Sequence, residues 1–250
     1  MSIHKTLILA VALLTAVAAS AQEATQPESD GTFRSSLLPS KAQAPWSIGL
    51  YGGMTHNTHV VDMSYAEGME YSAGSGLALG LTAAYHPTGW LALRAEPALV
   101  QKNYRLDRNN RYVNFAYTES TNNYLTLPVE AVLSLGRTFR VSGIVGLYGG
   151  YWLSGHRQGQ SLSVSYLVSG DEADTFFDEN YTFNSQRDRR FDAGLSYGIA
   201  LACTIFQRLD LSVELHYYYG LTDVQKSYMS QQNPRYNTTR AIRAGLSYWL

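Results

Sequence analysis

The last stretch of the chain reads Arg240-Ala241-Ile242-Arg243-Ala244-Gly245-Leu246-Ser247-Tyr248-Trp249-Leu250 and alternates between two kinds of side chain. One set is apolar and consists of Ile242, Ala244, Leu246, Tyr248 and Leu250, whereas the residues between them are mixed. Because successive side chains of a strand point to opposite faces, this stretch predicts a strand with one apolar and one mixed face. Such a strand is typical of a barrel whose outside contacts lipid and whose inside does not.

The other end of the chain carries the features of a secretory signal peptide. Lys5 supplies a positive charge, Leu7–Val17 is almost wholly apolar, and Ala19-Ser20-Ala21 fits an A-x-A cleavage site. A transmembrane anchor is the alternative, but the apolar stretch is too short to cross a bilayer comfortably. We therefore expect residues 1–21 to be removed and the mature chain to begin at Gln22.

The composition excludes several classes of protein. The chain is 45% hydrophobic with a mean hydropathy of -0.18, and no other long apolar stretch follows the leader, which excludes helical membrane spans there. The net charge of -1 gives no electrostatic basis for nucleic-acid binding. The 19 Tyr and 21 Gly suit a membrane barrel, which places aromatic residues at the interfaces and small residues inside.

Alternating segments follow a polar stretch at residues 22–45, which we expect to be a flexible periplasmic segment. There are eight of them, at residues 46–55, 74–85, 90–104, 124–135, 139–153, 190–205, 209–221 and 239–250. In the seventh, for example, Leu211 and Val213 alternate with Ser212 and Glu214. Each segment predicts one strand, and residues 46–250 predict one domain.

The connections between these segments alternate in length. Residues 86–89, 136–138 and 206–208 are tight turns, whereas residues 56–73, 105–123, 154–189 and 222–238 are long and polar. Membrane barrels have short periplasmic turns and long extracellular loops. A soluble barrel of eight strands is the alternative, but it would turn its apolar faces inward. We predict an all-β fold, an eight-stranded antiparallel transmembrane β-barrel in the bacterial outer membrane.

Eight charged residues of the predicted strands fall on the inner face, and an eight-stranded barrel has an interior that side chains just fill. They are Arg94, Glu96, Glu130, Arg140, Asp192, Asp210, Glu214 and Arg243. Because buried charges must be paired, we interpret them as a structural network of ion pairs and hydrogen bonds. The alternative is a charge-lined route for a small solute or a proton.

The long connections offer few residues for catalysis. A lipid-modifying enzyme would need a set at the rim, for which His56, His59, Asp62 and His156 are the candidates. The spacing of His56 and His59 is a weak signal for a metal, and no G-x-S-x-G motif occurs. We therefore interpret these residues as exposed loop histidines and expect no catalytic residues, no bound metal and no cofactor.

Two features of the connections suggest contacts with lipid or protein. Arg187, Arg189 and Arg190 cluster where the third long connection re-enters the membrane, and Arg105, Arg108 and Arg111 lie in the second. Their guanidinium groups suit the phosphates of outer-leaflet glycolipid, although ordinary solvation of the rim is the alternative. Phe176-Phe177 lies within an acidic stretch, and we expect it to be tucked against the barrel mouth rather than to contact a partner.

Three stretches of the chain resemble the PorT-like family of outer-membrane β-barrel domains. They are Tyr124-Leu125-Thr126-Leu127-Pro128-Val129-Glu130, Gly146-Leu147-Tyr148-Gly149-Gly150-Tyr151 and Arg190-Phe191-Asp192-Ala193-Gly194-Leu195. The resemblance covers residues 46–250 and implies a barrel. The family takes its name from a component of a protein secretion system, and its pattern defines no catalytic residues.

The sequence therefore favours a non-enzymatic outer-membrane barrel that acts through its long extracellular loops as a surface interaction, structural or secretion-associated component. The reason is that the long connections hold far more residues than closing a barrel requires. The alternatives are a lipid-modifying enzyme and a narrow channel through the charged interior. We expect outer-membrane lipid and secretion-system or surface proteins as partners, with no nucleic acid and no identified small-molecule substrate.

Overall fold

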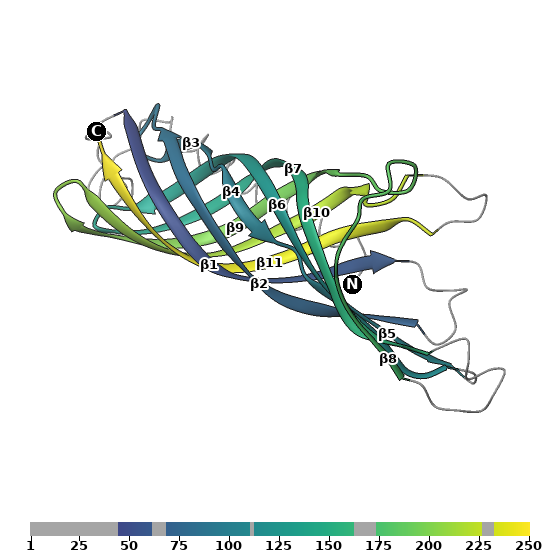
Figure 1. Ribbon diagram of the computed structural model, residues 1–250. Helices are drawn as coiled ribbons and strands as arrows, with labels where there is room; N and C mark the ends of the chain where they lie inside the picture. Colours follow the sequence, from purple (N-terminus) through teal and green to yellow (C-terminus); the bar gives the residue numbers. More distant parts are fainter. Residues whose placement is uncertain (1–44, 62–68, 111–112, 163–173, 227–232) are drawn as a thin grey trace, which may run out of the picture. The chain divides into compact units, whose positions relative to one another are not determined.

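A computed structural model describes residues 45–61, 69–110, 113–162, 174–226 and 233–250, which lie in the second of two compact units, Leu38–Leu250. They form one antiparallel sheet (Figure 1). Its strands are β1 Trp46–Val61, β2 Met69–Tyr85, β3 Leu91–Ala95, β4 Ala98–Gln101, β5 Tyr104–Asn110, β6 Val113–Gly136, β7 Phe139–Leu162, β8 Asp174–Asn180, β9 Phe191–Phe206, β10 Leu209–Asp223 and β11 Arg235–Trp249. The predicted signal peptide, residues 1–21, lies outside the described residues. So do residues 22–44 of the predicted periplasmic segment.

The strands pair into a closed ring. Each strand pairs with its neighbour from β1 to β2, through β3, β4 and β5 to β6, and on through β7, β9 and β10 to β11. β11 then pairs with β1 from Ser47↔Trp249 to Val61↔Arg235, which closes the ring. β3, β4 and β5 together form the third span and β8 only extends β7, so the predicted eight-stranded fold is confirmed. No helix in the described residues is long and apolar enough to cross a membrane.

The outward face of the ring is apolar. Leu77, Leu79 and Leu81 of β2 alternate with buried or small residues, and each is more than 60% exposed. Leu99, Leu127, Val141, Leu201 and Ile242 repeat this pattern around the ring. Exposing so many large apolar side chains to water would be costly, whereas lipid solvates them. The predicted lipid-facing sets are therefore confirmed.

The predicted tight turns join the strands at the periplasmic ends. β6 and β7 are linked by Arg137 and Thr138 alone, and β9 and β10 by Gln207 and Arg208 alone. Gly136 enters the first of these turns with φ at 103°, a left-handed conformation that favours glycine. These short links hold neighbouring spans in antiparallel register.

The third span is not the continuous strand, residues 90–104, that its alternation predicts. Proline has no backbone N–H for the ladder, and Pro97 separates β3 from β4. A second break spans Lys102 and Asn103, where the Asn103 side chain replaces backbone partners. Its Oδ1 accepts the N–H of Asn122 at 3.0 Å, and its Nδ2 donates to the Ser75 carbonyl at 2.7 Å.

The four long connections are shorter than the sequence predicts, because strands continue into them. β1 extends to Val61, β6 begins at Val113, β7 extends to Leu162, and β8 lies wholly inside the predicted third loop. The change from apolar to polar residues marks where the membrane face ends, not where the strand ends. In water, main-chain ladders sustain a strand whose two faces are both polar.

The prolonged strands separate from the ring on this side, which is extracellular in outer-membrane barrels. In the described residues, β1 and β2 stop pairing after Asn57↔Gly74, while β1 continues with β11. The remaining segments form what we call the outer sheet (Figure 1, around the labels β5 and β8). It consists of residues 69–73 of β2, β5, residues 113–123 of β6, residues 154–162 of β7, and β8.

Candidate functional sites in the barrel interior and the outer sheet

The middle of the barrel holds a cluster of ion pairs around Arg94. Its guanidinium lies 2.7 Å from Glu214 Oε1 and 2.8 Å from Glu130 Oε2. It also lies 3.2 Å from Glu96 Oε1. Arg94 is on the third span and Glu214 on the seventh, so this contact joins strands on opposite sides of the ring.

Arg243 and His216 complete this central cluster. Arg243 Nη2 lies 2.6 Å from Glu214 Oε2 and 2.7 Å from Glu96 Oε2. His216 Nε2 lies 2.9 Å from Glu130 Oε1 and 2.8 Å from Ser196 Oγ. Three carboxylates therefore face two guanidinium groups and one imidazole, and all are buried.

The central cluster ties the ring together across its interior. Removing one member of a buried ion pair leaves an uncompensated charge, which costs about 3–5 kcal/mol. Because each arginine contacts carboxylates on several spans, its removal would leave charges on all of them. This geometry is that of a packed core, as expected for a ring of this size.

A second cluster lies toward the extracellular end and centres on Asp192. Lys102 Nζ is 2.6 Å from Asp192 Oδ2, and its ammonium lies 4.5 Å from the centre of the Tyr148 ring. Asp192 also accepts hydrogen bonds from Tyr148, Asn237 and Thr222. The cation is thus held by one carboxylate and an aromatic face, both buried.

Sequence reasoning missed Lys102 and His216 as members of the interior network. Both have the parity of inward residues, since Lys102 follows Arg94 and Glu96 by even steps and His216 follows Glu214. That parity was the available signal. Lys102 stands near the polar end of its span, where the pattern does not separate the interior from the rim.

A third cluster closes the periplasmic end. Arg140 pairs with Asp210, which also accepts a hydrogen bond of 2.7 Å from Thr204 Oγ1. Trp249 donates its indole N–H to Asp210 Oδ2 at 2.6 Å. The Trp249 ring packs at a tilt against that of His86, with the ring centres 4.2 Å apart. The penultimate residue therefore points inward and caps the interior.

The eight predicted interior charges thus all lie inside the ring, divided among three clusters. The centre holds Arg94, Glu96, Glu130, Glu214 and Arg243, the extracellular end holds Asp192, and the periplasmic end holds Arg140 and Asp210. Each has a counter-charge within the interior.

The structure does not bring the candidate rim histidines together. His56 and His59 lie three positions apart on β1, so His56 points outward and His59 inward. His156 contacts Asp178 at 2.9 Å on the outer sheet, and Asp62 lies outside the described residues. In the described residues no group of His, Cys, Asp and Glu side chains could hold a metal ion.

His59 is an aromatic core residue, not the exposed loop histidine that the sequence predicts. Its ring lies 4.2 Å from that of Tyr104 and 5.5 Å from that of Tyr71. Burial, aided by the positive charge of Arg235, lowers the pKa of His59 to about 3. The side chain is therefore neutral at physiological pH. It lies beyond the apolar band that ends at Met54, since the next outward positions of β1, His56 and Thr58, are both polar.

The three arginines of the predicted lipid cluster differ in their surroundings. Arg187 donates to Asp188 Oδ1 at 2.9 Å and to the Tyr181 hydroxyl at 2.7 Å. Arg190 donates to the carbonyls of Trp152 and Leu153, and its guanidinium stacks 4.1 Å from the Phe183 ring and 4.6 Å from that of Tyr151. The Arg189 side chain is exposed.

Asp188 anchors the segment that carries these arginines. It is buried, and its Oδ2 accepts the N–H of Asn184 at 2.8 Å. Burial acts to raise the pKa of Asp188, but hydrogen bonds from Arg187 and Asn184 outweigh it and lower that pKa. Arg187 therefore serves an internal ion pair, whereas Arg189 and Arg190 stand at the rim.

Of the second predicted group of arginines, Arg105 is engaged in contacts within the outer sheet. Arg105 pairs with Asp107 at 2.8 Å and with Glu119 at 3.0 Å, and its guanidinium stacks on the Tyr117 ring. Arg108 is exposed, and Arg111 lies outside the described residues. These contacts fix the outward face of the outer sheet.

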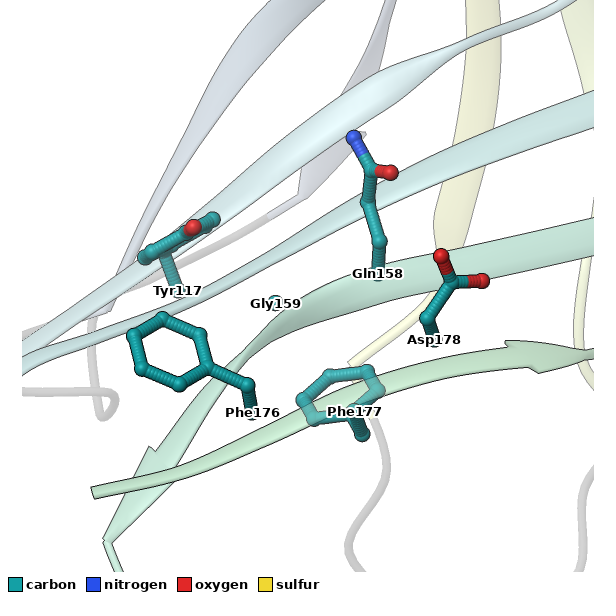
Figure 2. Close-up of a pocket in the computed structure, with 6 residues that line it drawn as sticks. All are labelled: Tyr117, Gln158, Gly159, Phe176, Phe177 and Asp178. Atoms are coloured by element: carbon teal, nitrogen blue, oxygen red, sulfur yellow. The ribbon is translucent and has the colours of Figure 1, made fainter.

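The predicted burial of Phe176-Phe177 against the barrel mouth is wrong for Phe176. Because the two rings lie on opposite faces of β8, Phe177 covers Gly159 of β7 whereas Phe176 is 69% exposed. Together with Tyr117 and Gln158 they line an open pocket of about 370 Å³. Figure 2 shows the Phe176 and Tyr117 rings at one end of this pocket and Asp178 at the other.

The closed ring, its lipid-facing exterior and its charged interior define an integral outer-membrane β-barrel protein. The chain belongs to the family described as outer membrane protein beta-barrel domain, whose model matches residues 21–226. The predicted location in the bacterial outer membrane is therefore confirmed. No curated protein matches the chain significantly.

Several solved outer-membrane proteins are similar to the chain. The Neisserial surface protein A is 10% identical over 81% of this chain and 97% of its own, with a TM-score of 0.41. Ail, the attachment invasion locus protein of Yersinia pestis, is 12% identical over 81% and 98%, with a TM-score of 0.38. OprG of Pseudomonas aeruginosa is 14% identical over 85% and 100%, with a TM-score of 0.43.

Proposed function

We propose that the protein is a non-conducting, non-enzymatic barrel that displays the outer sheet for contacts at the cell surface. The observation that carries this proposal is the continuation of β2, β5, β6, β7 and β8 as paired strands beyond the apolar band. Ordered strands present fixed side chains, and binding to a fixed surface loses less entropy than binding to a mobile loop.

The interior supports the non-conducting part of the proposal. The central ion pairs join opposite spans, and a ring of eight strands has little room besides its side chains. The separation of His56 from His59 on opposite faces disfavours a lipid-modifying site at the rim. A resemblance to PorT-like sequences favours a secretion-associated partner over a purely structural role.

Two measurements test the proposal. In planar bilayers the purified, refolded protein is expected to give no conductance steps, and reproducible steps would contradict a closed interior. In the second measurement, cells that carry the full chain and cells that carry a tip-deleted variant are mildly cross-linked, and the proteins recovered with each are compared. In that variant an Asn-Gly turn joins Arg157 to Glu179, which are register partners of β7 and β8.

The tip-deleted variant should keep its barrel, seen as faster migration of the unboiled protein in detergent gels. We expect cross-linked surface or secretion proteins with the full chain and their loss with the tip-deleted variant. Equal recovery from both, or from neither, would contradict a role for the outer sheet.

A further inference from the structure

The outer sheet ends in an open edge. β8 pairs with β7 from His156↔Asn180 to Leu162↔Asp174, and in the described residues no strand pairs with its other side. Along such an edge, alternate residues direct their N–H and C=O groups away from the sheet. Those groups are a template for a further strand.

β8 lacks the usual protection of an edge. Natural edges are blunted by proline, by bulges or by very short strands. The strand Asp174–Asn180 contains neither Pro nor Gly, and its register with β7 shows no bulge. Phe176 adds an exposed apolar ring beside the open edge. The protection that remains is negative charge.

The charge of β8 determines which strand can be added. Asp174, Asp178 and Glu179 are acidic and the strand carries no basic residue. The Asp178 side chain is 74% exposed even though it contacts His156. A second copy of β8 would set these carboxylates against one another, and like charges on opposing strands are destabilising.

The opposite edge of the outer sheet is also a poor partner for β8. It is residues 69–73 of β2, which carry Glu70 and no basic residue. Pairing between copies is therefore disfavoured at both edges. The occupant that the charge favours is a basic segment of a different protein.

We propose that the open edge of β8 binds an extended basic segment of a partner protein by strand addition. Along β8 the order Phe176-Phe177-Asp178-Glu179 places two aromatic residues next to two carboxylates. An antiparallel segment matches it with two adjacent basic residues followed by two adjacent apolar ones. The open pocket that Phe176 and Tyr117 line at one end and Asp178 at the other offers room for an apolar side chain on the outward face (Figure 2).

This inference rests on the proposed function and names the chemistry of the partner. It is tested with the full chain in lipid nanodiscs and a fluorescent peptide, Thr-Lys-Arg-Val-Val-Thr, by fluorescence anisotropy. The composition control is the alternating peptide Thr-Lys-Val-Arg-Val-Thr. We expect the block peptide to bind at least about tenfold more tightly than the alternating one, because two more side-chain pairs match across the strands.

Backbone pairing is tested separately by N-methylation of the block peptide. In an added strand only alternate N–H groups bond to the edge. Methylation of one alternate set should abolish binding, and methylation of the other set should be tolerated. Equal tolerance of both would show that attraction is electrostatic only and would overturn strand addition.

Charge is tested with the variant Asp178→Lys/Glu179→Lys. This variant should no longer bind the basic peptide and should instead bind an acidic peptide, Thr-Glu-Asp-Val-Val-Thr. The matched control is Glu70→Lys on the opposite edge, which should leave binding of the basic peptide unchanged. A similar loss with Glu70→Lys would overturn the assignment to β8.

Failure of this inference is distinguishable from failure of the proposed function. If no peptide binds while the tip-deleted variant still loses its cross-linked proteins, strand addition at β8 is wrong and the outer sheet acts by other contacts. If the tip-deleted variant keeps those proteins, the proposed function itself is wrong.

Discussion

Lys102 Nζ lies 2.6 Å from Asp192 Oδ2 and joins the third span to the sixth across the barrel interior. Both side chains are almost fully buried, and the aspartate accepts three further hydrogen bonds. Two of the three donors, Tyr148 and Asn237, are themselves buried. Removing either partner of such a pair leaves the other charge buried and uncompensated, which strongly destabilises the fold.

Replacing Lys102 with Met should destabilise the barrel. The substitution leaves the Asp192 carboxylate buried without its cation, and the expected cost is about 3–5 kcal/mol. Urea unfolding in detergent micelles, followed by tryptophan fluorescence, measures the free energy of unfolding. Lys226→Met, at an exposed lysine that donates to the Ser185 carbonyl, is the control and should change little. Equal effects of the two would contradict the interior pair.

Replacing Trp249 with Phe should loosen the periplasmic end. The variant keeps an aromatic ring beside His86 but loses the indole N–H that donates to Asp210. Hydrogen bonds to charged groups contribute about 1.5–3 kcal/mol. We expect the temperature at which the folded gel band disappears to fall. Tyr248→Phe, on the outward face, removes a hydroxyl without this partner and should leave that temperature nearly unchanged.

How much of the fold follows from sequence can be judged from β2 and β6. The alternation of Leu77, Leu79 and Leu81 correctly predicts a lipid-facing strand, and Gly136 marks the end of β6. The same alternation fails to predict how far the strands run beyond the membrane. There both faces of a strand are polar, so period-2 contrast disappears although the main-chain ladder continues.

The interior shows the same limit at the level of single contacts. Parity places Arg94 and Glu214 inside the ring, but it does not predict that they meet. Which inward residues share a level depends on the stagger between strands, and bulges and proline breaks alter that stagger. Pro97 and Asn103 introduce two such breaks in the span that carries Arg94 and Lys102.

His59 should make the extracellular end sensitive to acid. Its folded pKa of about 3 lies below its unfolded value of about 6.5, so protons bind more tightly to the unfolded state. Its contribution to stability is present above pH 6.5 and is lost as the pH falls toward 3. The loss can reach about 1.4 kcal/mol per pH unit.

The charges facing His59 are Arg235 and Lys102, which lower its pKa, and Asp192, which opposes them. His59→Phe keeps the aromatic contacts with Tyr71 and Tyr104 and removes the titration. Hydrogen exchange of the outer strands is measured at pH 7 and pH 5 and corrected for intrinsic rates. As the pH falls, exchange in the His59→Phe variant should become slower than exchange in the wild type. An identical pH dependence in both proteins would contradict a buried neutral His59.

Gly159→Val should disrupt the outer sheet without opening the barrel. A Cβ at Gly159 would meet the Tyr117 carbonyl oxygen and would lie 3.0 Å from the Phe177 ring. We expect faster hydrogen exchange in β8 and the facing part of β6, with normal gel migration of the unboiled protein. Gly149→Ala is the matched control, because a Cβ there would meet only the Phe191 ring at about 3.8 Å. Faster exchange throughout the barrel would show that the two regions are not independent.

Glycolipid contacts at the rim should depend on Arg189 and Arg190 and not on Arg187. The exposed side chain of Arg189 can meet a phosphate, and the Arg190 guanidinium stacks on the rings of Tyr151 and Phe183. Arg187 is occupied by Asp188 and Tyr181. Native mass spectrometry of protein extracted from outer membranes should show less phosphorylated glycolipid bound to Arg189→Gln and Arg190→Gln, with the wild-type amount on Arg187→Gln. Loss of bound glycolipid with Arg187→Gln alone would contradict this prediction, because Arg187 is paired internally with Asp188.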